Sequence, residues 1–325
     1  MYQFPVEQCD VLPERRRRLE RFRATRERWL ERLNGPHANA VSNQLRTLMY
    51  FDTAYATLTA AHRLEAYRPI NEMLFMLYEH GYASLIATGV RRLVDTDEKT
   101  GSLMSLVLAI ESVEQHESLF TRENFVCNDG LPFDFQTVID QFYRDNPAAN
   151  PEGYLRLPTS GPQGWMSSEL AHQAFDRLAA HVGGETRKRG DRISPQVFER
   201  LRTALASDPI KKLCAFVDTR IAHADHSRDL SAPHLNASLV DVAAAYQELV
   251  GVRNFLSATL LGGPSFASAV AVPQYDISAA LDEPFVGTDR LAEVGQIWHE
   301  ESEKRNQWSE AAELHGYYPI TASNP

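Results

Sequence analysis

The stretch that decides how this chain folds reads Phe216-Val217-Asp218-Thr219-Arg220-Ile221-Ala222-His223-Ala224-Asp225-His226. It holds two histidines, an arginine and two aspartates within eleven residues. Polar groups packed this densely on a helix with an apolar stripe cost stability unless each finds a partner. The stretch therefore predicts either a functional site or an internal polar network.

The residues before this stretch predict a helix that begins at Asp208. Asp208 can cap the first turn with its side chain, and Pro209 suits the first helical position. Apolar residues then recur at three- and four-residue spacing, which is typical of a helix with one buried face. This stripe comprises Ile210, Leu213, Cys214, Val217, Ile221 and Ala224.

The polar groups of the predicted helix fall on different sides of the stripe. Arg220 lies at one edge, and His223 follows three residues later, so both side chains can reach one pocket. Arg220 and His226 are six residues apart and converge only if the helix loosens near Ala224. The other side chains expected around this site are Phe216, on the same flank as Arg220, and Asp218 and Asp225, on the opposite flank.

The rest of the chain predicts an all-α protein, since helical periodicity recurs and no strand pattern is present. We expect an antiparallel bundle in three parts. An arginine-rich helix fills residues 1–36, a helical bundle fills 37–263, and a C-terminal helical extension fills 264–325. Residues 120–165 are rich in proline and glycine and predict a loop-rich insertion with one short helix at about 134–144.

Composition narrows the class of protein. Hydrophobic residues make up 43% of the 325 residues and charged residues 23%, as in ordinary globular proteins. No run approaches the ~18 apolar residues of a membrane span, and the N-terminus does not resemble a signal peptide. Three scattered cysteines argue for a reducing compartment and against a disulfide framework. We therefore expect a cytoplasmic protein with no membrane contact.

The charge is unevenly distributed. The net charge is −10, yet nine arginines fall within residues 12–33. An acidic body does not suit broad, nonspecific binding of duplex nucleic acid, so any such contact should be local. The arginine-rich helix is interpreted in two ways: as a solvated surface with interleaved glutamates, or as a face for RNA phosphates or a partner protein.

The string from Asp218 to Asp225 resembles the signature helix of HEPN-superfamily proteins, in particular the AbiU-like branch, where it often reads Arg-Asp-Lys-x-Ile-Ala-His. A second segment, Arg92-Leu93-Val94-Asp95 followed by Ser102-Leu103-Met104-Ser105-Leu106, resembles the "RLxD…SLxxL" segment of the same branch. Counting back from His223, the family's arginine position holds Val217. The pair with the spacing found in HEPN ribonucleases is Arg220 and His226.

The resemblance implies an RNA-directed protein that pairs as a homodimer, with two signature helices facing one cleft. Its activity would be metal-independent endoribonuclease chemistry of a defence or toxin system, with no cofactor and with a protein partner or antitoxin. The catalytic residues would then be Arg220, His223 and His226. The expected binding residues are Phe216, Asp218, Asp225, Arg92 and Asp95.

Three alternatives remain open from the residues alone. Arg220 and His223 could belong to an internal hydrogen-bond network in which the arginine reaches Asp95 or a backbone carbonyl. His223, Asp225 and His226 could bind a transition metal, with His234 or His172 as a distant ligand, although no spacing favours it. The chain could also be a catalytically silent HEPN-like scaffold that binds a partner protein.

Overall fold

The structure is a computed structural model. It describes residues 2–64, 71–145, 159–181, 186–221, 237–266 and 287–314, together with short pieces at 269–270, 273–276 and 279. The chain divides into two compact units, Met1–Ala271 and Val272–Pro325. The first unit contains the signature segment and all of the buried core described below.

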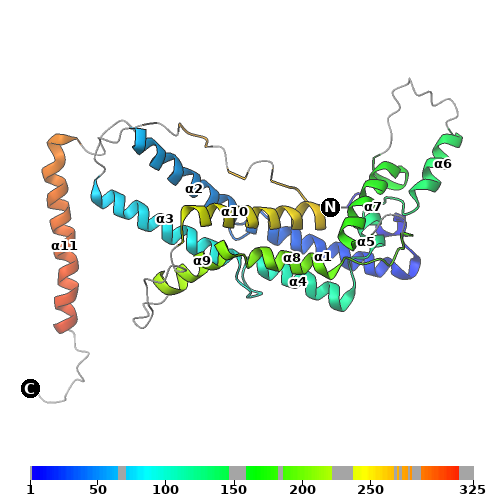
Figure 1. Cartoon of the computed structure of the whole chain (residues 1–325), viewed down its shortest axis with the longest axis horizontal. Coiled ribbons are helices and arrows are strands. Elements are labelled where there is room, and N and C mark those ends of the chain that lie inside the picture. Colours follow the sequence, from blue (N-terminus) through cyan, green and yellow to red (C-terminus); the bar gives the residue numbers. More distant parts are fainter. Residues whose placement is uncertain are drawn as a thin grey trace, which may run out of the picture. The chain divides into compact units, whose positions relative to one another are not determined.

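Helices account for nearly all of the regular structure in the described ranges, which contain no strand, so the all-α class predicted from the sequence is confirmed (Figure 1). The first unit contains α1 Arg16–Asn34, α2 Val41–Leu64, α3 Glu72–Leu93, α4 Leu103–Glu117, α5 Arg122–Cys127, α6 Phe135–Asp145, α7 Trp165–Ala179, α8 Pro195–Leu205, α9 Asp208–Phe216 and α10 Leu239–Asn254. Two π-helical turns, Val217–Ile221 and Phe255–Leu260, continue α9 and α10. The second unit contains α11, Leu291–Leu314.

The prediction of a loop-rich insertion at residues 120–165 is partly wrong. The short helix expected at about 134–144 is α6, but a second helix, α5, was not expected and lies in the core with Val126 and Cys127 buried. Residues 146–158, the centre of the predicted insertion, lie outside the described residues. Six residues are too few for periodicity to reveal a helix, and charged residues at its start hide the burial.

The arginine-rich helix α1 belongs to the first unit, whereas the sequence-based division gave residues 1–36 a domain of their own. Its apolar residues Leu19, Phe22, Trp29 and Leu33 are buried in the common core. Trp29 stacks on Phe120 with ring centroids 5.6 Å apart. The boundary between the compact units falls after Ala271, later than the expected start of the C-terminal extension at 264.

Several α1 arginines bind backbone carbonyls of other segments. Arg23 donates from Nε to the carbonyl oxygen of Asn128 at 2.7 Å. Arg26 bonds the carbonyl of Gly262 at 3.1 Å, and Arg32 bonds that of Thr100 at 3.3 Å. These three side chains join α1 to the body of the unit, a role that neither interpretation of the helix included. Arg17 and Arg18 remain exposed.

The signature segment packs between two neighbours. α9 contacts α3 on one side and α10 on the other, and the π-helical turn Val217–Ile221 also contacts α3. α2 in turn packs on α3 and α10 (Figure 1). The four helices α2, α3, α9 and α10 therefore form the part of the unit that positions the candidate site.

The three cysteines differ in burial. Cys9 and Cys127 lie in the core, and Cys214 on α9 is half-buried. Burial raises the pKa of all three thiols, most of all that of Cys127. Within the described residues, no helix combines the length and the apolar character needed to cross a membrane.

Candidate functional site

The signature helix begins where the sequence predicts, although its cap differs. Asp208 is the first residue of α9 and Ser207 precedes it as the N-cap, with no side-chain cap hydrogen bond. Pro209 occupies the second position, where its missing N–H costs nothing. Asp208 is therefore a first-turn acid that suits the helix dipole, not the cap.

The prediction of a buried apolar stripe is confirmed up to Val217 and is wrong at Ile221. Ile210, Leu213 and Val217 are buried, whereas Ile221 is 41% exposed. The change coincides with the π-helical turn Val217–Ile221, whose i→i+5 bonds place more residues in each turn than an α-helix does. Residue 221 therefore rotates away from the buried face that ideal α-helical spacing predicts.

Arg220 lies on this π-helical turn with an exposed side chain. It was expected at the edge of a buried stripe, where it would need a buried partner such as Asp95. Asp95 instead accepts hydrogen bonds within its own loop, from the Asp97 N–H at 3.0 Å and, at its carbonyl, from the Ser102 hydroxyl. The exposure of Arg220 places its charge at the surface, where it can meet a ligand.

The second segment that resembles the family meets the signature helix through a neighbouring residue. Arg91, not Arg92, contacts Asp218, with Nε 2.8 Å from Oδ1. Arg92 donates to the side chain of Asn39 at 2.8 Å. Both members of the Arg91–Asp218 pair are about half exposed, so the pair contributes roughly 0–1 kcal/mol. Its effect is to hold the end of α3 against the π-helical turn.

His223, Asp225 and His226 lie outside the described residues, as does His234. In the described part of the chain, no group of three or more His, Cys, Asp or Glu side chains is arranged to hold a metal ion. The remaining candidate ligand, His172, lies in a separate cluster described below.

A cavity of about 360 Å³ adjoins the signature helix on the flank of Phe216. Phe216 is half-buried and packs on the core, so it faces inward and not onto a flat outer surface. The cavity is lined by Tyr55, Glu79, Tyr82, Ala83, Ile86, Ala87, Leu213, Phe216, Ala237, Ser238, Leu239 and Val242. A volume above roughly 300 Å³ is in the range of small-molecule sites.

Tyr55 and Tyr82 line one side of this cavity, and Tyr78 stacks on Tyr55 outside the lining. The centroid of the Tyr55 ring lies 3.7 Å from that of Tyr82 and 4.8 Å from that of Tyr78, and the ring is nearly parallel to both. The Tyr55 hydroxyl donates to Oε1 of Glu79 at 2.7 Å, and burial together with this bond raises the pKa of Tyr55 to about 12. The Tyr82 hydroxyl donates to Asp52, and burial raises its pKa further still. Both phenols therefore stay protonated at neutral pH.

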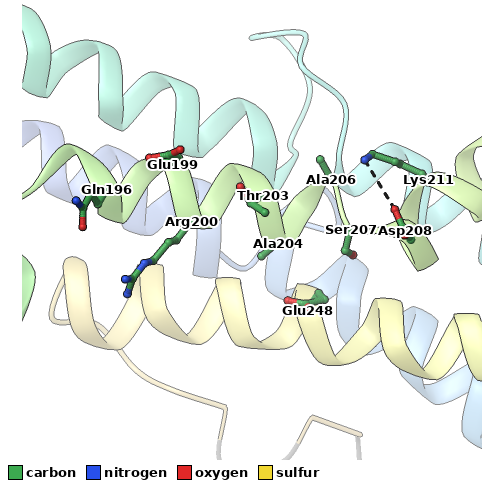
Figure 2. A pocket seen from close by; sticks show the side chains of 10 residues that line it. All are labelled: Gln196, Glu199, Arg200, Thr203, Ala204, Ala206, Ser207, Asp208, Lys211 and Glu248. Atoms are coloured by element: carbon green, nitrogen blue, oxygen red, sulfur yellow. Dashed lines mark ion pairs between the residues drawn. The ribbon is translucent and has the colours of Figure 1, made fainter.

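A second, more open pocket of about 690 Å³ lies along α8, α9 and α10. Figure 2 shows its polar lining, with Arg200 and Glu199 on α8 and Glu248 on α10. Lys211 and Asp208, at 4.0 Å, are strongly exposed. Charges of both signs are interleaved along this groove, which is typical of a solvated surface between helices.

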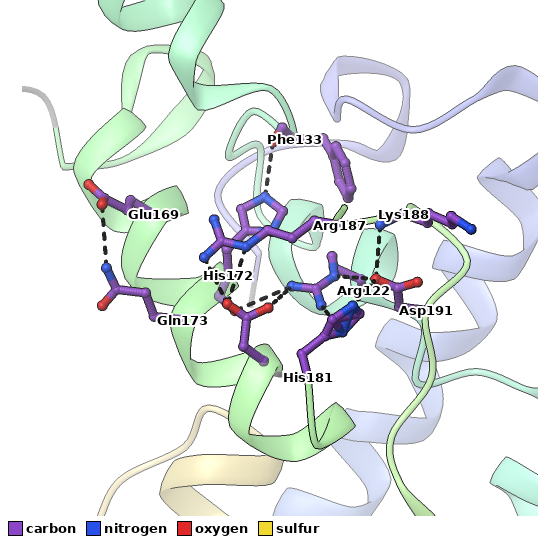
Figure 3. Close-up of polar contacts among 10 residues, drawn as sticks. Arg122, Phe133, Glu169, His172, Gln173, His181, Arg187, Lys188 and Asp191 are labelled. Atoms are coloured by element: carbon purple, nitrogen blue, oxygen red, sulfur yellow. Dashed lines mark hydrogen bonds and ion pairs between the residues drawn. The ribbon is translucent and has the colours of Figure 1, made fainter. Parts of the chain in front are cut away.

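A buried ionic cluster surrounds α5, far along the chain from the signature segment (Figure 3). The side chain of Arg122 is fully buried and binds Asp191, Nε to Oδ2 at 2.9 Å, and Asp176, Nη1 to Oδ1 at 2.6 Å. Arg187 binds the second oxygen of Asp176 at 2.7 Å. Because every charge is matched, the cluster is an internal network that fixes the loop 186–192.

His172 lies beside this cluster (Figure 3). Its Nε2–H donates to the carbonyl oxygen of Phe133 at 2.9 Å, which leaves Nδ1 as a buried acceptor with no partner among the described residues. Burial lowers the pKa of His172 to about 4, so the ring is neutral at physiological pH.

Sequence reasoning missed the residues that shape the cavity. Tyr82 lines the cavity and follows Tyr78 by four residues on α3, a spacing that fits ordinary core packing as well as a site. The only signal was the acidic Glu79 between them in a strongly apolar segment.

Comparisons with known proteins returned no match to this chain among family models, curated proteins or solved structures.

Proposed function

We propose that this chain is an RNA-directed, HEPN-like protein that cleaves RNA without a metal ion. The observation that carries the proposal is the exposed Arg220 on a π-helical turn, three residues before His223. π-Helical turns occur frequently at functional sites. An exposed arginine ahead of a histidine also suits phosphate chemistry better than it suits a sealed core network.

The proposed reaction uses the RNA's own 2′-hydroxyl as the nucleophile. A histidine, His223 or His226, removes the proton from this hydroxyl while its oxygen attacks the adjacent phosphorus. The bond to the 5′-oxygen breaks, and a second histidine protonates that leaving oxygen. The products are a 2′,3′-cyclic phosphate and a 5′-hydroxyl. Arg220 neutralises the negative charge that develops on the phosphate and does not titrate.

We propose that two copies of the chain share this site. One copy supplies a single Arg220, and a two-fold axis would place two copies of each group around one phosphate. Apolar residues exposed in this region support the pairing, among them Ile221 at 41% and, at the start of α10, Leu239 at 54% and Val240 at 78%. Phe216 contributes less than the sequence suggested, because it faces the cavity.

The test uses purified protein and a labelled single-stranded RNA in buffer that contains a chelator. We expect cleavage to 2′,3′-cyclic phosphate ends, loss of at least about 100-fold in rate for Arg220→Ala and His223→Ala, and a dimeric mass in solution. Arg177→Ala, which removes an exposed arginine on α7, is the matched control and should cleave normally. Cleavage that requires a divalent ion, or that survives Arg220→Ala, contradicts the proposal, as does a monomer.

A second candidate is a catalytically silent scaffold that binds a partner protein. It is favoured by the first half of α3, where the consecutive residues Met73 to Leu77 are all exposed and Leu77 is 71% exposed. Contiguous apolar patches of this kind mark interaction sites. No cleavage and no RNA affinity at low salt would select this candidate.

A further inference from the structure

The side chains that line the cavity beside Phe216 offer a ligand hydrogen-bond acceptors only. The cavity's only charged side chain is Glu79, whose Oε1 accepts a hydrogen bond from the Tyr55 hydroxyl. Within the described residues, its second oxygen, Oε2, has no hydrogen-bond partner. The hydroxyl hydrogens of the remaining polar groups are already committed, that of Tyr82 to Asp52 and that of Ser238 to Asp241. The lining side chains therefore offer acceptors and no free donor.

The aromatic lining of the cavity favours a flat ligand. The rings of Tyr55, Tyr82 and Phe216 line it together with short side chains such as Ala83 and Ala87. Bases of single-stranded RNA stack on aromatic side chains and present their Watson–Crick edges to hydrogen-bonding groups. About 360 Å³ is enough space for one such base.

We infer that this cavity is a binding subsite for a guanine base of single-stranded RNA, with Glu79 as the residue that selects it. Guanine is the base whose Watson–Crick edge carries two adjacent donors, N1–H and the N2 amino group, which match the two oxygens of one carboxylate. Adenine and cytosine place a ring acceptor beside their single amino group, and that acceptor would face the carboxylate unfavourably. Guanine O6 requires a donor, and the backbone N–H of Leu239, a lining residue at the start of α10, has no intrahelical acceptor.

The subsite rests on the proposed RNA-directed function and adds a substrate preference to it. Phe216 and Arg220 are four residues apart on consecutive turns of one helical segment. A base held at Phe216 therefore places its own ribose and phosphate within one helical turn of Arg220. The expected consequence is cleavage next to a guanosine.

The test measures binding of mononucleotides to the intact chain by calorimetry, so it requires no cleavage. We expect guanosine 5′-monophosphate to bind about tenfold more tightly than inosine 5′-monophosphate, which lacks the N2 amino group, and more tightly again than the adenosine, cytidine and uridine monophosphates. Glu79→Gln still accepts the hydrogen bond from the Tyr55 hydroxyl but presents one acceptor and one donor. It should weaken guanosine monophosphate about tenfold and abolish the preference over inosine.

Two further variants separate the subsite from general effects. Glu72→Gln removes an exposed carboxylate from the same helix outside the cavity and should bind normally. Ala83→Leu fills the cavity and should weaken all purine nucleotides. Unchanged helix content and melting temperature for each variant show that the fold is intact.

The subsite is refuted if guanosine monophosphate fails to bind at millimolar concentration or binds Glu79→Gln equally well. Selective binding of N-acetyl-arginine methylamide, a planar cation with several donors, would also refute it by assigning the cavity to a peptide. The two proposals fail separately. Guanosine monophosphate binding without any RNA cleavage keeps the subsite and removes the nuclease, and cleavage without binding does the reverse.

Discussion

At the residue scale, the buried charged side chains of this protein stabilise its fold, whereas a ligand reaches the exposed ones. Arg122 is sealed against Asp176 and Asp191, and Glu123 binds Arg15 and Arg189 with its own carboxylate almost fully buried. Removing one member of such a group leaves the others buried and uncompensated. Arg220, by contrast, is exposed, so its substitution should leave the fold intact.

His172 makes stability depend on pH. Its pKa is about 4 in the folded chain and ~6.5 when unfolded, so below pH 6.5 the unfolded state binds more protons. The stabilising contribution of the neutral ring is complete above pH 6.5 and is lost as the pH falls toward 4. We expect the wild-type chain to lose roughly 2–3 kcal/mol more than His172→Gln between pH 7.5 and 4.5, measured by urea unfolding.

The control for this experiment is His116→Gln, at an exposed histidine near the end of α4. It should follow the wild-type pH dependence. Parallel curves for the wild type and His172→Gln would mean that the buried ring does not titrate as its surroundings require.

At the scale of elements, the signature segment shows how far periodicity reaches. The stripe of α9 predicts Ile210, Leu213 and Val217 correctly because they lie in regular α-helix. Ile221 falls after the change to π-helical bonding, in a turn that contacts α3, and this change has no signature in the spacing. The same limit hid α5, whose burial follows from partners dispersed over more than sixty residues of sequence.

Two matched substitutions test where the buried stripe ends. Leu213→Ala removes a core side chain and should cost about 2–5 kcal/mol in the free energy of unfolding. Ile221→Ala should cost no more than ~0.5 kcal/mol because its side chain is largely in solvent. Denaturant unfolding of the isolated variants measures both. Equal losses would place Ile221 in the core and restore an uninterrupted α-helix.

The candidate site was only partly predictable from the sequence. Arg220 and Phe216 could be selected because a dense polar string on an apolar stripe is unusual. Their surroundings could not, since Tyr55, Glu79 and Tyr82 come from helices more than a hundred residues away and individually look like ordinary helix residues. Periodicity along the sequence does not show which distant side chains enclose a space. Those side chains are what defines a cavity.

At the scale of the whole molecule, the described core belongs to one unit. Every buried apolar residue of the described ranges lies between Val6 and Leu261. The apolar residues of α11, such as Ile297 and Trp298, are exposed. The first unit therefore has what it needs to fold by itself.

A chain that ends after Ala271 should keep its cooperative unfolding. We expect its melting temperature to stay within about 3 °C of the full chain, a shift that corresponds to less than ~1 kcal/mol in a protein of this size. Calorimetry of both chains measures it. A chain that instead ends after Asn254 loses the buried Leu256 and Leu260 and should be clearly destabilised. A large loss from the first truncation would show that the second unit contributes to the core.

The three thiols give this protein reporters of its own motions. An alkylating reagent attacks the thiolate, and Cys9 and Cys127 expose almost nothing to it while their raised pKa values keep them protonated. Cys214 lies two residues before Phe216 and is half-buried. Burial also raises the pKa of the Cys214 thiol, but its partial exposure lets a reagent reach it. Its modification rate therefore follows local opening of α9, whereas the other two react when the first unit comes apart. Measuring the modification rate of each cysteine separately therefore distinguishes local opening of α9 from unfolding of the first unit.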